Sequence, residues 1–213
     1  MKNINKVLFS LVFVGMSMIS SRMYGQTLGG LRLKDSDDGP KGQFQLYGSF
    51  DYSKTSTPTS SGSAVSSSPI GAGYWINNND LIGVNYAYSQ QKTDKKVISK
   101  QNEAGFWYSP SVQLGKYFYL IAQVDADFVW GQQQSTIDGS MENFNGFRLR
   151  AYPMIGIVVG SGWALKFKFA ELSMLQTKTK EGWSKSYVSG INGTTFGVGV
   201  SKNFNFKRKN KKS

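Results

Sequence analysis

The sequence of 213 residues lacks cysteine and histidine entirely. Without cysteine there can be no disulfide framework and no lipid attached to a cysteine. Without histidine the chain lacks the commonest general base and the commonest metal ligand. We therefore expect no catalytic residue, no metal site and no bound cofactor. The fold must then be stabilised by burial and backbone hydrogen bonds alone.

Long apolar runs are also scarce, and the one at the N-terminus covers residues 7–19 (VLFSLVFVGMSMI). A transmembrane helix needs about 20 apolar residues, so this run is too short to span a bilayer. It follows Lys2 and Lys6 and precedes the small residue Gly25, which is the order of a secretory signal. We predict that residues 1–25 are a cleaved signal peptide. The alternative is a buried helix of a cytosolic domain.

Positive charge is in excess, with 25 Lys and Arg against 13 Asp and Glu and a formal net charge of +12. Removing residues 1–25 removes three cations, and five more lie in residues 207–213 (KRKNKKS), so the body is near +4 (12 − 3 − 5). A basic chain can indicate nucleic-acid binding. Export and the aromatic pattern described next argue against a nucleic-acid partner. We interpret residues 26–42 as a periplasmic N-terminal linker rich in Gly and Asp, and residues 207–213 as a basic C-terminal tail.

Most of the remaining chain alternates apolar residues with polar or small ones. In residues 69–89 (PIGAGYWINNNDLIGVNYAYS), one phase holds Ile70, Tyr74, Ile82 and Val84, and the other is rich in Gly and Asn. A period of two is typical of a β-strand, because successive side chains leave opposite faces. No segment has an apolar face of helical period. Eight segments show the alternation: 44–53, two within 69–89, 103–114, 120–130, 147–157, 163–169 and 196–206.

The connections between these segments alternate in length. The long ones are residues 55–68, 91–102, 132–143 and 178–193, and the short ones are NNND, GKY and GSG. An even number of strands, with long loops at one end and tight turns at the other, is typical of an up-and-down barrel. We predict an all-β fold, an eight-stranded antiparallel up-and-down transmembrane β-barrel over residues 43–206, with both chain ends on the short-turn side.

The polar phase carries charges that this fold would bring together. If the hairpin after the fifth segment is centred near residues 137 and 138, Asp127 falls opposite Arg148 and Asp125 opposite Arg150. Directly opposed residues on one face lie about 5 Å apart. Opposite charges in register indicate an ionic network that fills the lumen, and the alternative is a set of exposed cross-strand pairs. The predicted lumen charge network comprises Asp51, Asp125, Asp127, Arg148, Arg150, Lys166 and Lys168.

Tyrosine and tryptophan on the apolar phase gather toward the ends of the segments, while Val, Ile, Leu, Ala and Phe occupy the middles. Aromatic rings with a polar group suit the two interfaces of a membrane. Glycines share the phase of the charges, where small residues are needed beside long ones in a narrow interior. We therefore predict that the apolar phase faces lipid. The predicted membrane-interface aromatics are Tyr52, Tyr74, Tyr86, Tyr88, Tyr108, Trp130 and Trp163.

The stretch 69–89, the signal ending YGQ and the closing FGVGVSKNFNF together resemble the small outer-membrane β-barrel family of Bacteroidetes-type bacteria, which is porin-like and of OmpA/OmpX-type size. The shared pattern covers roughly residues 43–206. The resemblance implies an outer-membrane location, usually no known reaction, and an aromatic insertion signal at the C-terminal end, here Phe204 and Phe206. Such barrels usually finish on an aromatic residue, whereas this chain continues with KRKNKKS.

These features predict a non-enzymatic barrel of the cell outer membrane, with a side-chain-filled lumen and a structural or surface-binding role through long extracellular loops. The expected partners are outer-membrane lipid, the outer-membrane insertion machinery and a surface ligand or protein, with a monomeric chain. Two alternatives remain open. A soluble lipocalin-like carrier of an apolar ligand would show the same alternation, and a membrane-embedded enzyme without histidine could use Asp125 and Asp127 for acid/base chemistry.

Overall fold

The computed structural model describes residues 39–57, 60–93, 96–135, 137–190 and 196–205, with the backbone alone described for strand residues within 51–68. The predicted signal peptide, most of the predicted linker, Phe206 and the basic tail lie outside these residues. The described residues form ten strands: β1 (Phe44–Thr57), β2 (Ser60–Trp75), β3 (Asp80–Thr93), β4 (Lys96–Gln113), β5 (Phe118–Gln134), β6 (Met141–Gly160), β7 (Trp163–Lys168), β8 (Glu171–Lys178), β9 (Trp183–Gly190) and β10 (Gly197–Phe204).

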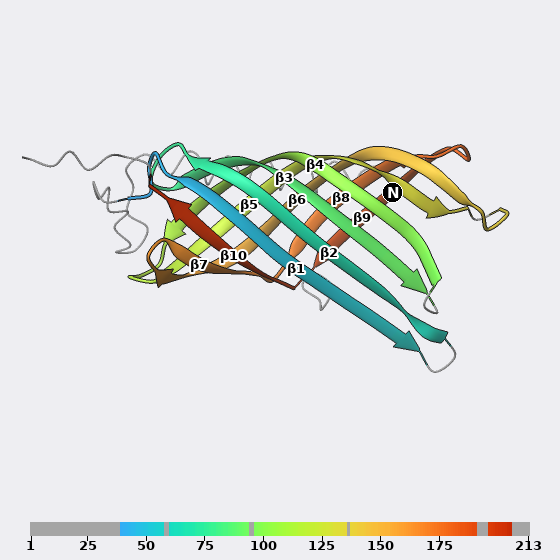
Figure 1. Cartoon of the computed structure of the whole chain (residues 1–213), viewed down its shortest axis with the longest axis horizontal. Coiled ribbons are helices and arrows are strands. Elements are labelled where there is room, and N and C mark those ends of the chain that lie inside the picture. The colour runs from blue at the N-terminus through green and yellow to red at the C-terminus, as the bar shows by residue number, and fades with distance from the viewer. Residues whose placement is uncertain (1–38, 58–59, 94–95, 136, 191–195, 206–213) are drawn as a thin grey trace, which may run out of the picture. The chain divides into compact units, whose positions relative to one another are not determined.

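Eight of these strands close into an antiparallel ring. Each strand from β1 to β6 pairs with the next one in the chain, β7 pairs with β10, and β10 pairs with β1. The closing pair runs in register from Phe44 opposite Phe204 to Phe50 opposite Val198. The tilted strands and the two ends of the ring can be followed in Figure 1. The predicted all-β, eight-stranded antiparallel fold is confirmed.

The seventh strand is interrupted, which the alternation did not predict. On β6, Met154 opposes Lys168 of β7, but Ala151 opposes Leu172 of β8. The chain from β7 to β8 therefore contains one residue more than the facing part of β6. Pro153 lies at this point of β6 and has no backbone N–H to donate, while its carbonyl accepts a 3.4 Å hydrogen bond from the N–H of Phe169. The result is a β-bulge. Strand β8 therefore continues the seventh strand beside β6, and Phe169 lies outside β7.

The predicted long loops are wrong as loops, because strands occupy much of them. Strand β2 begins at Ser60, β3 continues to Thr93, β4 begins at Lys96 and β9 begins at Trp183, all within the predicted loops. Strands of up to 20 residues exceed the roughly 9–11 that a membrane crossing needs. The long links are therefore hairpin extensions of the wall. We call the end that carries them the long-hairpin end.

The short turns match the prediction and have clear local causes. After β2, the Asn77 side-chain Oδ1 accepts 2.7 Å hydrogen bonds from the N–H groups of Asn79 and Asp80, which fixes the turn. Between β6 and β7, Ser161 (φ 50°) and Gly162 (φ 80°) both adopt the left-handed conformation that a tight hairpin requires. Residues Phe44 and Phe204 lie at this same short-turn end, so the described chain ends lie where the topology predicted.

Burial separates the two faces of the wall. The phase of Phe106 (73% exposed) points outward, and the phase of Asp127 (0%) points inward. Near the short-turn end the inward face combines an apolar cluster of Trp75, Leu81 and Trp107 against Tyr47 with buried polar side chains such as Gln45. The predicted polar lumen did not include this apolar cluster. No described segment is a helix with the length and apolar character that a bilayer crossing requires.

Glycines on the inward face make room for the buried rings. A Cβ on Gly83 would lie 2.4 Å from Trp107 Cζ2 and 2.3 Å from the carbonyl oxygen of Ala72. A Cβ on Gly73 would lie 2.6 Å from Trp107 Cη2, and one on Gly71 2.3 Å from Tyr47 Cε1. These contacts are shorter than any that real Cβ atoms make. The predicted pairing of small with large inward residues is confirmed at these positions.

We expect Gly83→Ala to lower the free energy of unfolding by about 1–3 kcal/mol, because overpacking a filled interior forces side chains or backbone to shift. Chemical denaturation measures the change. The matched control is Gly115→Ala in the β4–β5 turn, where an added Cβ meets nothing within 4 Å. Equal stability of the two variants would contradict this account of the interior.

Candidate functional site

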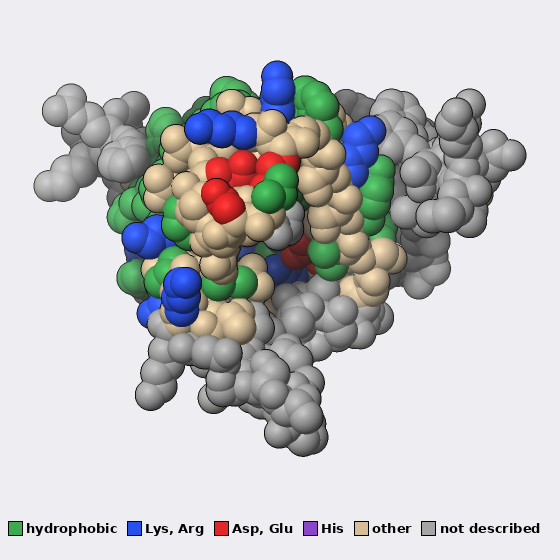
Figure 2. All heavy atoms as spheres, turned by 90° about the vertical axis from the view of Figure 1, so that its right-hand side faces the viewer, with side chains coloured by type: hydrophobic (Ala, Val, Ile, Leu, Met, Phe, Trp, Pro, Cys, Tyr) green, Lys and Arg blue, Asp and Glu red, His purple; other side chains and the backbone are tan. Residues whose placement is uncertain are grey.

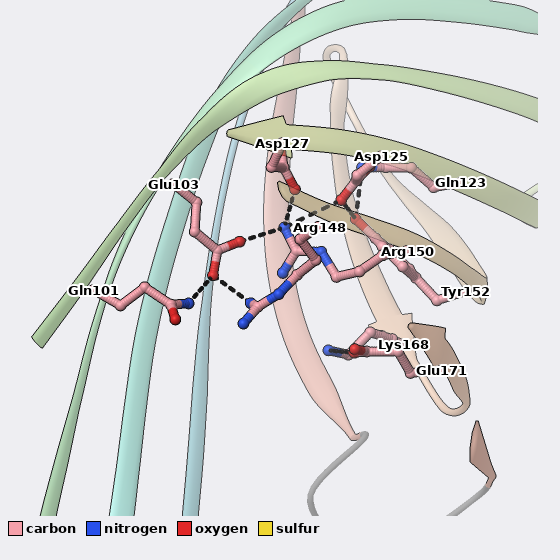
Figure 3. Close-up of polar contacts among 10 residues, drawn as sticks. All are labelled: Gln101, Glu103, Gln123, Asp125, Asp127, Arg148, Arg150, Tyr152, Lys168 and Glu171. Carbon is pink, nitrogen blue, oxygen red and sulfur yellow. Dashed lines mark hydrogen bonds and ion pairs between the residues drawn. The ribbon is translucent and has the colours of Figure 1, made fainter. Parts of the chain in front are cut away.

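The inward charges meet in one cluster, shown in Figure 3. The register places Asp125 opposite Arg150 and Asp127 opposite Arg148 on β5 and β6, as predicted. We use the name charge cluster for five residues from three neighbouring strands: Glu103, Asp125, Asp127, Arg148 and Arg150. Its three carboxylate side chains are at most 3% exposed.

Arg150 holds the charge cluster together. Its Nη2 atom lies 2.8 Å from Asp127 Oδ2, 3.1 Å from Glu103 Oε2 and 3.5 Å from Asp125 Oδ2. The Arg150 side chain is itself only 13% exposed. A buried charge is costly unless it is paired and hydrogen-bonded. One guanidinium thus contacts all three carboxylates, which would otherwise repel one another.

Arg148 forms a different pair from the one that its register suggests. Although it stands opposite Asp127, its Nη1 atom makes an ion pair with Glu103 Oε1 on β4. The same Glu103 oxygen accepts a 2.6 Å hydrogen bond from Gln101 Nε2. The long arginine side chain reaches past the adjacent strand, so the expected Asp127–Arg148 ion pair is replaced by one that crosses the lumen-facing side of β5.

Neutral side chains orient Asp125. Gln123 Nε2 donates a 2.8 Å hydrogen bond to Asp125 Oδ1, and the Tyr152 hydroxyl donates a 2.9 Å hydrogen bond to Oδ2. Gln123 also donates to the Tyr152 hydroxyl at 2.6 Å. Both Asp125 oxygens therefore have partners, which fixes the carboxylate as a hydrogen-bond acceptor.

The two predicted lysines lie beside the charge cluster and have separate partners. Lys168 Nζ pairs with Glu171 Oε2 at 3.1 Å and lies 5.6 Å from the centre of the Tyr152 ring. Lys166, which is 7% exposed, donates a 2.7 Å hydrogen bond to Gln45 Oε1. Its ammonium lies 5.5 Å from the centre of the Tyr47 ring. The side chain of the remaining predicted member, Asp51, is not among those described.

The described inward charges nearly balance. Five of them are acidic and four are basic: Glu103, Asp125, Asp127, Glu142 and Glu171 against Arg148, Arg150, Lys166 and Lys168. A small cavity of about 40 Å³ lies among Tyr47, Gln123, Lys166 and Gly197. A site of this size and polarity suits a few water molecules. The described interior is therefore densely filled and close to neutral.

Chemically, the charge cluster resembles a structural network more than a reaction centre. A general base needs a carboxylate that is free to take a proton from a substrate. Asp125 and Asp127 instead contact Arg150, and the adjoining cavity is small. Among the described residues there is no group of three or more acidic side chains that could hold a metal ion.

The predicted membrane-interface aromatics whose side chains are described lie on the outward phase. Tyr74, Tyr86, Tyr88, Tyr108 and Trp163 are 37–46% exposed. Two hydroxyls have polar partners, because Tyr86 donates to Asn102 Oδ1 at 2.7 Å and Tyr108 to Asp80 Oδ1 at 2.8 Å. Trp130 is partly buried against Tyr86 and Phe128, with ring centres 6.5 Å and 5.8 Å apart. The Tyr52 side chain is not described.

Of the predicted insertion signal, Phe204 is the last residue of β10 and Phe206 lies outside the described residues. The role of Phe204 in insertion stays a prediction.

Sequence reasoning missed several members of the network. The sequence prediction places Glu103 at the start of the fourth segment and rests on the apolar phase of that segment. Its other phase reads Gln101, Glu103, Gly105, Trp107 and continues the polar face of β5. That phase could have indicated Glu103. Gln45 and Tyr152 carried no comparable signal, because their partners Lys166 and Asp125 lie on other strands. Gln123 lies two residues before Asp125 and Glu171 three residues after Lys168, and these spacings could have indicated both.

No family model matches the sequence, and no curated protein is similar to it at a significant level. Several solved structures are similar. Ail, the attachment invasion locus protein of Yersinia pestis, is 12% identical, with 77% of this chain and 99% of that chain covered and a TM-score of 0.43. The N-terminal β-barrel domain of Pseudomonas aeruginosa OprF is 12% identical, with coverage of 77% and 100% and a TM-score of 0.45. A de novo designed transmembrane β-barrel is 13% identical, with coverage of 77% and 97% and a TM-score of 0.38.

Arg150→Ala should lower the free energy of unfolding by about 3–5 kcal/mol, because it leaves buried carboxylates without their shared cation. Chemical denaturation checks this value. The control is Lys116→Ala, which removes an exposed cation from the β4–β5 turn. Adding Asp127→Asn to Arg150→Ala should recover part of the loss. A double variant that is less stable than Arg150→Ala would refute the shared-cation account.

Proposed function

We propose that the protein is an integral membrane β-barrel of the bacterial outer membrane, without catalytic activity. The observation that carries this proposal is the exposed apolar wall. Phe106 (73% exposed), Phe128 (55%) and Ile70 (58%) point outward from β4, β5 and β2. Soluble monomers rarely expose large contiguous apolar surfaces. A wall of this kind suits the hydrocarbon of a bilayer.

Closure of the strand ring supports the same proposal. Hydrocarbon offers no hydrogen bonds, so a spanning structure must pair its backbone groups internally. The β1–β10 pairing satisfies the backbone groups of the two terminal strands over residues 44–50 and 198–204. Register also aligns aromatic side chains in two rows, one containing Tyr74 and Tyr108 and the other Tyr88 and Trp130. Two such rows are typical of the two interfaces of a membrane.

The filled interior favours this proposal over both alternatives. A carrier of an apolar ligand needs an apolar cavity large enough for its cargo, whereas the cavity beside Lys166 is about 40 Å³ and lined by charged and polar groups. A wide channel needs about 16 strands or more. An enzyme would need a free acid or base, and the aspartates are engaged by Arg150. Assays for hydrolysis with Asp125→Asn and Asp127→Asn address that last alternative.

A structural or surface-binding role at the long-hairpin end completes the proposal. Figure 2 looks onto this end and shows acidic side chains on the central part of the face with Lys and Arg around them. Trp183 and Tyr187 of β9 are 65% and 53% exposed. Ser135 and Glu181 join two hairpin tips through a side-chain hydrogen bond. Exposed aromatic and charged groups on a paired scaffold suit a ligand or protein at the cell surface.

Location and assembly follow from the same proposal. The predicted signal peptide would export the chain, the insertion machinery would recognise an aromatic end at Phe204 and Phe206, and outer-membrane lipid would surround a monomer. The long-hairpin end then faces outside the cell and the short-turn end faces the periplasm.

Phe106→Arg should destabilise the barrel in lipid by about 2–4 kcal/mol, because a charge on the lipid face is costly near the bilayer midplane. Denaturant unfolding in lipid vesicles measures this change. Membrane fractionation and gel migration before and after boiling report insertion. Phe106→Leu, which keeps the position apolar, is the control.

The alternative of a soluble carrier makes the opposite prediction. Its outer wall would meet water, so Phe106→Arg would leave it folded and soluble. Recovery of the wild-type protein in the soluble fraction would refute the membrane proposal.

A further inference from the structure

A lysine interrupts the apolar outer wall near the short-turn end. On β10, Lys202 shares the outward phase with Val198, Val200 and Phe204. Across the strands it stands opposite Leu46 of β1 and Trp163 of β7. The lysine is therefore on the face that we propose to be lipid-facing. A charge in such a wall is expensive unless it reaches the interface or finds a partner.

A groove lies directly beside this lysine on the outside of the ring. It has a volume of about 290 Å³ and crosses the β1–β10–β7 wall. Val200 of β10 stands opposite Gly48 of β1, which leaves a gap in the row of large outward side chains between Leu46 and Phe50. A Cβ on Gly48 would come no closer than 3.8 Å to Ile70 Cγ2, so this position has room for a side chain. The groove is lined by Leu46, Gly48, Trp163, Val200, Lys202 and Phe204.

The lysine head group is turned toward the end of the wall. Its Nζ atom donates to the carbonyl oxygen of Ser161 in the β6–β7 turn and lies 5.1 Å from the centre of the Trp163 ring. The stem of the side chain lies along apolar neighbours while the ammonium reaches the turn, as amphipathic side chains do at interfaces. The groove thus has an apolar lining that includes the stem of Lys202, and the Lys202 ammonium lies beyond its end, at the β6–β7 turn.

We propose that this groove binds an anionic phospholipid of the periplasmic leaflet, with the phosphate group beside Lys202 and one acyl chain over Gly48. The inference rests on the proposed membrane location. A negatively charged head group joined to an apolar chain matches both ends of the groove, since anionic lipids are attracted to basic groups at the membrane surface. A second copy of the chain fits less well, because a two-fold interface here would bring two Lys202 ammonium groups together.

The alternative is that Lys202 only extends to the membrane interface and binds no particular lipid. In that case the shape of the groove would not affect lipid retention. We would test the two accounts with the protein purified from membranes and reconstituted in nanodiscs or mixed micelles that contain phosphatidylglycerol and phosphatidylcholine. Native mass spectrometry then reports which lipid stays bound. The wild type should retain a phosphatidylglycerol molecule about fivefold more tightly than phosphatidylcholine, the effect expected for one basic residue.

Two variants separate charge from shape. Lys202→Gln should remove the preference for phosphatidylglycerol, and Gly48→Leu should reduce retention of both lipids by filling the groove. The matched controls are Lys116→Gln, another cation beside an aromatic ring at a turn, and Ala126→Leu, which places the same side chain on the outer wall of β5. Both controls should behave as wild type.

Two outcomes would overturn the proposed lipid site. Equal retention of the two lipids by the wild type would remove the charge contribution, and a Gly48→Leu variant that retains lipid as the wild type does would remove the groove. Gel migration before and after boiling shows that each variant has folded. A wild-type chain that fails to enter lipid would instead refute the membrane location itself, which distinguishes that failure from a failure of the lipid site.

Discussion

The pairing of the last strand with the first is the constraint on which the rest of this structure depends. Once β10 meets β1, every strand of the ring has two neighbours, and the wall has only an inner and an outer face. Strict alternation then decides where each side chain goes, because a shift of one residue would exchange the two faces. The buried ion pairs and the apolar outer wall are both consequences of that closure.

The interior is divided into two zones with different means of filling space. Near the short turns, the rings of Tyr47, Trp75 and Trp107 pack where glycines on neighbouring strands give them room. Further along, Arg150 contacts three carboxylates beside a small cavity. Apolar packing contributes stability through burial, whereas the ionic zone depends on the pairing of its charges, so that removing one member leaves others uncompensated.

The sequence predicted what depends on local alternation and little of what depends on long side chains. Eight segments, their antiparallel order and the Asp125–Arg150 register could be predicted, because strand periodicity and turn position determine them. The Arg148–Glu103 pair could not, since a guanidinium that reaches across a strand follows no sequence spacing. The sequence predicts loops for hairpin extensions such as residues 96–101, because strands that extend beyond the apolar band are polar on both faces and show no alternation of apolar and polar residues. The β7–β8 bulge needed the position of Pro153 against its partner strand, which only pairing reveals.

The pairing of Phe44 with Phe204 joins residues that are 160 positions apart in the chain (204 − 44). Contacts of such long range form late, because a large loop must lose its conformational entropy before they reward it. Until that moment the two terminal strands present unpaired edges and half of every strand presents apolar side chains to water. A nascent chain of this kind is prone to aggregation until its final strand has been made and docked.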